Sequence, residues 1–250
     1  MIVMAMEQWY RSWFDSPYYH LLYAHRDDTE AGLFIENLAR ELRMPAGSHV
    51  LDLACGRGRH SLMLHQMGFR VTGIDLSPSN IQYARKATKH HLNFEVGDMR
   101  ADLGEDRFDY IFNLFTSFGY FERKEENIKA CQAMARSLKP GGKLILDFLN
   151  VHKVELGLVE EEVKEIEGIR FHIERFIRDG MVIKKISFTD KGEEHFYEEK
   201  VQLLTKNNFE ELLAQGGLRI DKCYGGFNLD SFDFRNSERL ILFASLCKPC

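Results

Sequence analysis

The sequence predicts an α/β protein with a doubly wound, mainly parallel sheet and an antiparallel β insertion. Short apolar runs alternate with helical patterns over residues 46–150, which indicates parallel strands covered by helices on both faces. This rhythm stops over residues 151–204, where alternating segments surround Asp179-Gly180, a strong signal for a hairpin turn. Because the alternation resumes over residues 205–250, we expect one domain over residues 1–250, with the insertion as part of it.

The first 45 residues predict a helical cap. Trp9 and Trp13 stand four residues apart, as do Tyr10 and Phe14, a spacing that places each pair on one face of a helix. Apolar residues at helical spacing follow over residues 33–42, and the pattern ends at the Pro-Ala-Gly break that precedes the first strand.

Residues 46–150 predict the core of the sheet. Five short apolar strands are expected, at residues 49–53, 69–74, 92–96, 108–114 and 143–149. The helices between them are expected between Gly58 and Gly68, from Ser77-Pro78 to about His90, and over residues 125–138.

The insertion predicts a hairpin with a defined register. A two-residue turn at Asp179-Gly180 places Ile173 opposite Ile186 and leaves one face mostly apolar. Arg175 opposite Lys184 is the exception on that face. Residues 195–204 predict a third strand, and beyond the insertion a helix at 208–215 and strands at 218–224 and 240–246 complete the core.

The composition is typical of a soluble globular protein, with 44% hydrophobic and 28% charged residues. The formal net charge of −5 argues against a nucleic-acid partner, and no apolar stretch reaches the length of a membrane span. The apolar start is too short for a signal peptide. The five cysteines form no dense pattern, and the Cys247–Cys250 pair lacks a second pair nearby, so we expect a cytoplasmic protein without a metal site.

Four features follow successive predicted strands, at the edge where open parallel sheets bind ligands. They are the turn at residues 52–58 (Asp-Leu-Ala-Cys-Gly-Arg-Gly), Asp75, residues 97–100 (Gly-Asp-Met-Arg) and residues 113–121. The glycines of the turn allow a ligand to approach the backbone. A carboxylate at Asp75 can accept both hydroxyls of an unphosphorylated ribose, and residues 97–100 are placed to reach an adenine edge.

Each feature alone also has a structural interpretation, as a tight turn, a helix start or a loop acid. Their joint order favours a nucleoside cofactor, and two cofactors compete for it. A dinucleotide site expects a third glycine or alanine where Ser61 stands, and it gains little from Asp52 beside a pyrophosphate. A cofactor with an amino group and a cationic sulfonium gains from Asp52, which favours S-adenosylmethionine.

These motifs, together with residues 138–142 (Leu-Lys-Pro-Gly-Gly), resemble the ordered motifs of class I S-adenosylmethionine-dependent methyltransferases over residues 48–150. Residues 227–242 are similar to the C-terminal end of bacterial small-molecule members. The resemblance implies a Rossmann-like, seven-stranded sheet whose last strand is antiparallel, with S-adenosylmethionine as cofactor.

The resemblance also implies residue roles: Asp52 and Gly56 near the methionine part, Asp75 at the ribose, and Asp98 with Met99 around the adenine. The expected cofactor-binding residues are Asp52, Ala54, Cys55, Gly56, Gly58, Arg59, Asp75, Leu76, Ser77, Gly97, Asp98, Met99, Asn113, Leu114, Phe115, Tyr23 and Arg26. The expected substrate-binding residues are Tyr18, Tyr19, Ser117, Tyr120 and Arg239.

We expect a small-molecule acceptor, methylated on nitrogen or oxygen. Residues 113–116 (Asn-Leu-Phe-Thr) depart from the Pro-Pro-aromatic motif of members that methylate nucleic-acid bases, and an aromatic cap suits a compact ligand. Cys131 falls within a helix, which indicates a packed hydrophobe and not a nucleophile. His60, Tyr19 and Tyr120 are candidate bases, and no catalytic residue is assigned.

Three alternatives remain from the sequence. The first is a non-catalytic regulator that binds S-adenosylmethionine. The second is a methyltransferase that acts on RNA or protein, and the third is a nicotinamide-dependent oxidoreductase. We expect a monomer or a homodimer.

Overall fold

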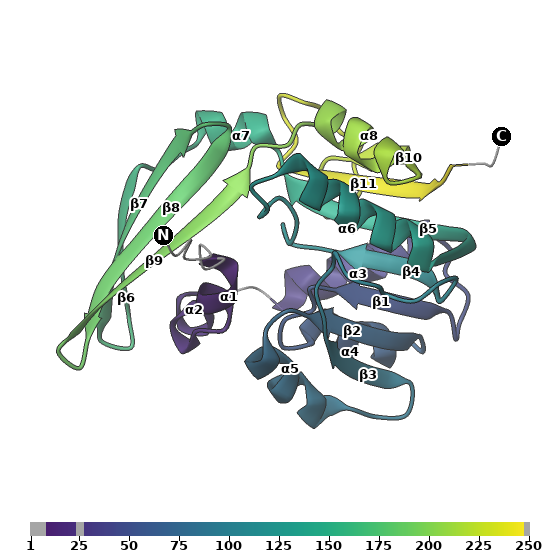
Figure 1. The fold of residues 1–250 in the computed structure, drawn as a ribbon, viewed down its shortest axis with the longest axis horizontal. Helices are drawn as coiled ribbons and strands as arrows, with labels where there is room; N and C mark the ends of the chain where they lie inside the picture. The colour runs from purple at the N-terminus through teal and green to yellow at the C-terminus, as the bar shows by residue number, and fades with distance from the viewer. Residues whose placement is uncertain (1–8, 24–27, 248–250) are drawn as a thin grey trace, which may run out of the picture.

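The computed structural model describes residues 9–23 and 28–247, and its centre is a seven-stranded sheet (Figure 1). The strand order is β10-β11-β5-β4-β1-β2-β3. The strands are β1 (His49–Leu53), β2 (Arg70–Asp75), β3 (Leu92–Val96), β4 (Phe108–Asn113), β5 (Leu138–Leu149), β10 (Leu218–Tyr224) and β11 (Arg239–Leu246). The last strand, β11, is antiparallel to both neighbours, while β1 to β5 pair in parallel. The predicted fold class is therefore confirmed.

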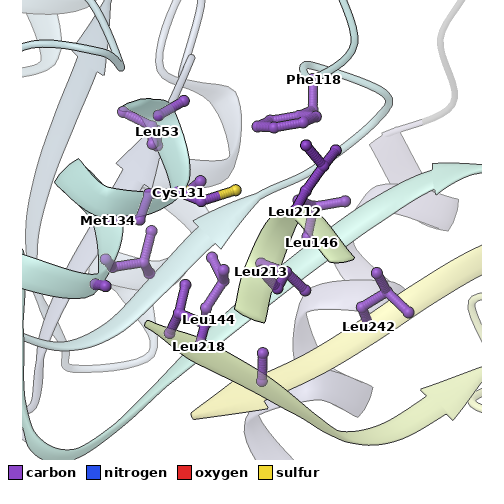
Figure 2. Packing of buried hydrophobic residues seen from close by; sticks show 14 of the residues in the cluster. Leu53, Phe118, Cys131, Met134, Leu144, Leu146, Leu212, Leu213, Leu218 and Leu242 are labelled. Carbon is purple, nitrogen blue, oxygen red and sulfur yellow. The ribbon is translucent and has the colours of Figure 1, made fainter. Parts of the chain in front are cut away.

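Helices cover both faces of this sheet. One face carries α3 (Asp28–Glu41), α4 (Arg59–Gln66) and α5 (Pro78–Ala84), and the other carries α6 (Lys124–Ser137) and α8 (Lys206–Gln215). Figure 2 shows the hydrophobic core on the second of these faces, where side chains of α6 and α8 pack against Leu144 and Leu146 of β5. Cys131 of α6 is fully buried there among apolar neighbours, as the sequence predicts.

The insertion forms a separate four-stranded antiparallel sheet in the order β6-β7-β8-β9. Its strands are β6 (Glu161–Ile166), β7 (Ile169–Arg178), β8 (Met181–Asp190) and β9 (Glu193–Gln202), and α7 (Val151–Leu156) leads into it. Ile173 pairs with Ile186, which confirms the predicted register. Strand β6 and helix α7 were not expected, because β6 is mostly exposed and lacks an apolar face.

The short helices α1 (Trp9–Phe14) and α2 (Pro17–Leu22) lie between the two sheets (Figure 1). Trp13 and Leu22 pack with Phe171, Ile173 and further apolar side chains of the insertion in one buried cluster. The sequence predicts a helical cap over residues 1–45. Of its described helices, α1 and α2 contact the insertion. Helix α3 packs on the main sheet instead, because Phe34, Ile35 and Leu38 are buried there.

Most boundaries in the main sheet and its helices lie within two residues of the sequence expectation, and two differ by five residues or more. Helix α5 ends at Ala84 and continues only as a 3₁₀ turn to Ala87, because the chain must turn back into β3, where Arg85 Nε donates to the carbonyl of Phe94. Strand β5 begins at Leu138, five residues early, because the chain already pairs with β4 there, although Gly141 has a positive φ of 82°. Leu138 pairs with Phe108, and a bulge absorbs the extra residues.

The buried face of the insertion predicts a position-dependent loss of stability. Ile173 is 2% exposed and Ile177, on the same strand, is 40% exposed. Ile173→Ala should lower the free energy of unfolding by at least about 2 kcal/mol, because it leaves a cavity in the cluster shared with the cap. The matched change Ile177→Ala should cost less than about 1 kcal/mol. Urea denaturation measures both, and equal losses would contradict this packing.

Candidate active site

A cavity of about 930 Å³ opens at the carboxyl edge of the main sheet and extends beneath the cap. The ends of β1, β2, β3 and β4 form its floor, with Asp52, Asp75, Asp98 and Phe115 among the lining residues. Helices α1 and α2 and strand β9 form the opposite wall. The topology therefore brings the four features predicted from the sequence to one place.

The turn after β1 is built for close approach by a ligand. Gly56 and Gly58 have φ values of 56° and 80°, the left-handed region that favours glycine. A Cβ at Gly58 would lie 2.6 Å from the ring of Phe94, so this position tolerates no side chain. A Cβ at Gly56 would meet no atom within 4 Å, because this part of the backbone faces open space at the cavity.

Asp75 lies at the end of β2 and anchors the neighbouring turns. Its carboxylate accepts hydrogen bonds from the backbone N–H of Gly56 at 2.8 Å and of Ser77 at 2.9 Å. Burial raises its pKa despite these bonds. The side chain of Asn80 also hydrogen-bonds to this carboxylate, and the acceptor position that remains is available to a hydroxyl donor in the cavity.

Asp52, on β1, is 2% exposed and accepts a hydrogen bond from Ser61 Oγ at 2.5 Å. Burial, together with the nearby carboxylate of Asp75, raises the pKa of Asp52 to about 6. Keeping Asp52 ionised at pH 7 therefore costs about 3 kcal/mol of stability, and this cost is lost as the pH falls from about 6 to the ordinary pKa of 3.8. A cationic group in the cavity would offset it.

Asp98, after β3, forms ion pairs with two arginine side chains. Arg100 donates to both of its oxygens, at 2.9 and 2.5 Å, and Arg11 of α1 lies 3.7 Å away. Burial opposes ionisation of Asp98, but the hydrogen bonds from Arg100 outweigh it, so its pKa lies below the usual range. The adjacent Met99 also lines the cavity.

The loop after β4 is strained and firmly held. Phe115 and Thr116 both have positive φ, of 56° and 59°. The fully buried Asp147 of β5 accepts from the backbone N–H of Phe115 through its carboxylate and from that of Thr116 through its own carbonyl. Arg239 of β11 donates to the same carboxylate at 2.8 Å and to Thr116 Oγ1 at 2.9 Å.

Most of the predicted site residues line this cavity, but three do not. Asn113 is fully buried and donates to the carbonyl of Leu53, the last residue of β1, so its amide group bonds within the sheet. Tyr18 turns toward the insertion and donates to Asp190, and Arg239 is held by Asp147. Arg26 lies outside the described residues. The predicted residues that do line the cavity are Asp52, Ala54, Cys55, Gly56, Gly58, Arg59, Asp75, Leu76, Ser77, Gly97, Asp98, Met99, Leu114, Phe115, Tyr23, Tyr19, Ser117 and Tyr120, together with the candidate base His60.

Five rings form a continuous aromatic wall at the cap end: Trp9, Phe14, Tyr19, Tyr23 and Tyr120. Successive ring centroids lie 4.9 to 5.3 Å apart, from Tyr23 through Tyr19, Phe14 and Tyr120 to Trp9. Trp9 and Phe14 were not predicted as site residues, because the sequence does not show which side of α1 faces the cavity.

A polar cluster of Trp13, Tyr23, Lys184 and Glu199, here the Glu199 cluster, adjoins this wall. Glu199 accepts from Trp13 Nε1 at 2.6 Å and from the Tyr23 hydroxyl at 2.8 and 3.0 Å. Lys184 donates to the Tyr23 hydroxyl, and its Nζ lies 3.8 Å from Glu199. Glu199 is not among the predicted site residues. Lys184 was a signal for it, because a lysine on an apolar face indicates that an acid faces it from a neighbouring strand.

S-adenosylmethionine fits the residues at the floor of the cavity. The open backbone at Gly56 leaves room that a Cβ would fill, and the buried carboxylate of Asp52 suits the cofactor's cationic amino group and sulfonium. Asp75 offers acceptors for ribose hydroxyls, and Met99 an apolar surface for a base.

Comparison with known proteins agrees with this fit. Residues 50–142 match the model of a family described as "Methyltransferase domain". YqeM, described as a methyltransferase in Bacillus subtilis (strain 168), is 29% identical over 83% of this chain and 88% of its own. The dTDP-3-amino-3,4,6-trideoxy-alpha-D-glucopyranose N,N-dimethyltransferase of Streptomyces venezuelae is 28% identical over 77% of this chain and 84% of its own.

A solved structure shares the fold. The S-adenosylmethionine-dependent methyltransferase from Clostridium acetobutylicum ATCC 824 superimposes with a TM-score of 0.77 over 92% of this chain and 96% of that one, at 22% identity. The motifs, the fold and the family match together define the class: the chain is a class I S-adenosylmethionine-dependent methyltransferase, and S-adenosylmethionine is its cofactor.

Within residues 9–23 and 28–247, His, Cys, Asp and Glu side chains do not gather in groups of three or more that would hold a metal ion. In the same ranges, no helix combines the length and the apolar character needed to cross a membrane.

Asp75 gives the first prediction from this site. Asp75→Ala should weaken the affinity for S-adenosylhomocysteine at least about tenfold, since a hydrogen bond to a charged group contributes about 1.5–3 kcal/mol. The control Glu105→Ala removes an equal charge from an exposed position and should leave the affinity unchanged. Calorimetry that finds Asp75→Ala equal to the control would reject the ribose assignment.

Asp52 gives a pH prediction. Its pKa of about 6 means that it is mostly protonated at pH 5 and ionised at pH 7, and only the ionised form attracts a cation. The affinity for S-adenosylmethionine should therefore rise about tenfold from pH 5 to pH 7. Asp52→Asn should flatten this profile, and calorimetry at both pH values compares the two proteins. A profile that keeps its slope in the variant would contradict the assignment.

Proposed function

We propose that this enzyme transfers the methyl group of S-adenosylmethionine to a nucleophile on a small molecule that binds at the cap end of the cavity. The observation that carries this proposal is the wall opposite the cofactor motifs. Helices α1 and α2 and strand β9 line the cavity there, so the cavity of about 930 Å³ offers a concave site beside the cofactor motifs that suits a compact acceptor.

The aromatic wall supports a compact, partly apolar acceptor. A nucleic-acid substrate needs a broad basic track that neutralises phosphates, whereas this wall presents rings. Among the relatives, the Streptomyces venezuelae enzyme is named for the methylation of an amino sugar nucleotide, a small molecule. Both points favour a small acceptor over RNA or protein.

Residue roles follow from the geometry. We assign Asp52, Gly56 and Asp75 to the cofactor, and Tyr19 and Tyr120 to the acceptor. The cofactor supplies an electrophilic methyl group on a sulfonium, which is a good leaving group. The protein's contribution is to align the acceptor and to exclude water, and the wall opposite the cofactor motifs suits both tasks.

The site of action and the assembly belong to the same proposal. We propose that the enzyme acts in the cytoplasm as a monomer or homodimer, in agreement with four described cysteines that are all free.

The proposed acceptor class predicts where labelled methyl groups go. With labelled S-adenosylmethionine, the purified enzyme should label a small-metabolite extract and leave total RNA and total protein unlabelled. A variant of the cavity floor, Asp75→Ala, is the negative control. Salt-sensitive labelling of RNA alone would overturn the proposal. Cofactor binding without transfer to any fraction would favour a regulatory protein.

A further inference from the structure

The insertion presents two described side chains to the cavity, Glu199 and Val201 of β9. Among the described residues four acids line the cavity, and three of them, Asp52, Asp75 and Asp98, stand at the strand ends that form the cofactor floor. Glu199 is the acid on the opposite wall. It accepts hydrogen bonds from Trp13 and Tyr23 of the cap. We assign this end of the cavity to the acceptor, and Tyr23, which the sequence predicts at the cofactor, moves with it.

The bonding of Glu199 leaves it able to accept further. An ionised carboxylate has about four acceptor positions. Trp13 and Tyr23 supply one donor proton each, and the donated proton of Lys184 goes to the Tyr23 hydroxyl instead. Lys184 is 13% exposed and does not line the cavity. The carboxylate of this pair lines the cavity, whereas the ammonium of Lys184 lies over the ring of Tyr23, 4.5 Å from its centroid.

The surrounding rings are suited to the same kind of ligand. Tyr19 and Tyr23 line the cavity next to Glu199, with ring centroids 4.9 Å apart. Aromatic faces attract cations, and the attraction is stronger where water is excluded. A carboxylate flanked by rings binds an ammonium group better than it binds a neutral hydroxyl of similar shape, because only the cation gains from both.

We propose that Glu199 and the flanking tyrosines anchor an amino group of the acceptor, so that the substrate is a small alkylamine that binds as its ammonium ion. This inference rests on the proposed function, since it concerns the acceptor half of the same cavity. Glu199 is a specificity-determining residue in this scheme, and Lys184 and Trp13 are positioning residues that fix its carboxylate.

The chain carries its own reporter for this site. Its two tryptophans are Trp9, which lines the cavity, and Trp13, which donates to Glu199. Intrinsic tryptophan fluorescence therefore follows ligand binding at the cap end without a known substrate. The probes are benzylamine and its neutral counterpart benzyl alcohol, each titrated at neutral pH with S-adenosylhomocysteine at saturation.

The variant Glu199→Gln removes the charge and keeps an oxygen that accepts from Trp13 and Tyr23. Its control is Glu198→Gln. Glu198 is the next residue of β9, so it points to the other face of the sheet, where it pairs with Lys200 at 2.7 Å. Both variants lose one charge from the same strand, and only Glu199→Gln loses it from the cavity.

Wild type and Glu198→Gln should bind benzylamine at least about tenfold more tightly than benzyl alcohol, and in Glu199→Gln this preference should fall to less than about threefold. Equal affinities in wild type, or a preference that survives in Glu199→Gln, would overturn the proposal. A merely structural Glu199 would weaken both probes equally and lower the melting temperature. Calorimetry with S-adenosylhomocysteine distinguishes failure of this inference from failure of the proposed function. If the wild type binds S-adenosylhomocysteine but does not prefer the amine, only the role of Glu199 is rejected. If the wild type does not bind S-adenosylhomocysteine, the proposed function is rejected.

Discussion

The side chain of Trp13 joins the cap to the insertion, and the wall of the cavity opposite the cofactor motifs depends on it. The indole is fully buried between the rings of Tyr19 and Tyr197, and its only polar atom donates to Glu199. An indole N–H buried without a partner would be costly, so the carboxylate and the ring fix each other. Because α1 and α2 are too short to be stable alone, their position comes from this contact and from the apolar cluster around it.

A different constraint acts on the floor of the cavity, where two acidic side chains lie close together. Asp52 and Asp75 stand on neighbouring parallel strands and share a buried edge, so burial and their mutual repulsion raise the pKa of Asp52. Packing does not require this arrangement, because an apolar pair would fill the same space at lower cost. A ligand that brings positive charge and hydroxyl donors would offset the cost of burying these two acids.

The sequence was sufficient to predict the residues at the floor of the cavity. It was insufficient to predict the opposite wall, here called the roof, which α1, α2 and β9 form. Parallel strands place their carboxyl ends at one edge, so motifs that follow apolar runs must converge whatever the details of packing. Glu199 has no such signal: it belongs to a strand with several acids, and only the register against β8 brings it opposite Lys184. The hairpin turn fixes the register of β7 and β8, but β9 follows a second turn whose position the sequence left open.

The predicted residues that do not line the cavity show how its floor is held. Asn113 and Arg239 are polar residues next to strand ends, the pattern that also predicts ligand contacts. Asn113 instead secures the carbonyl of Leu53, and Arg239 completes the shell of the buried Asp147. Without that shell the left-handed backbone at Phe115 and Thr116 would relax, since each such residue costs about 1 kcal/mol or more.

The floor and the roof are therefore held by different means. Buried polar groups anchored in the main sheet hold the floor rigidly, and the roof rests on a cluster shared by two short helices and the insertion. A rigid floor suits a cofactor whose shape is constant. A roof that comes from separate elements allows the acceptor site to change through β9 and the cap while the cofactor site stays intact, so differences in acceptor between relatives should concentrate in these two segments.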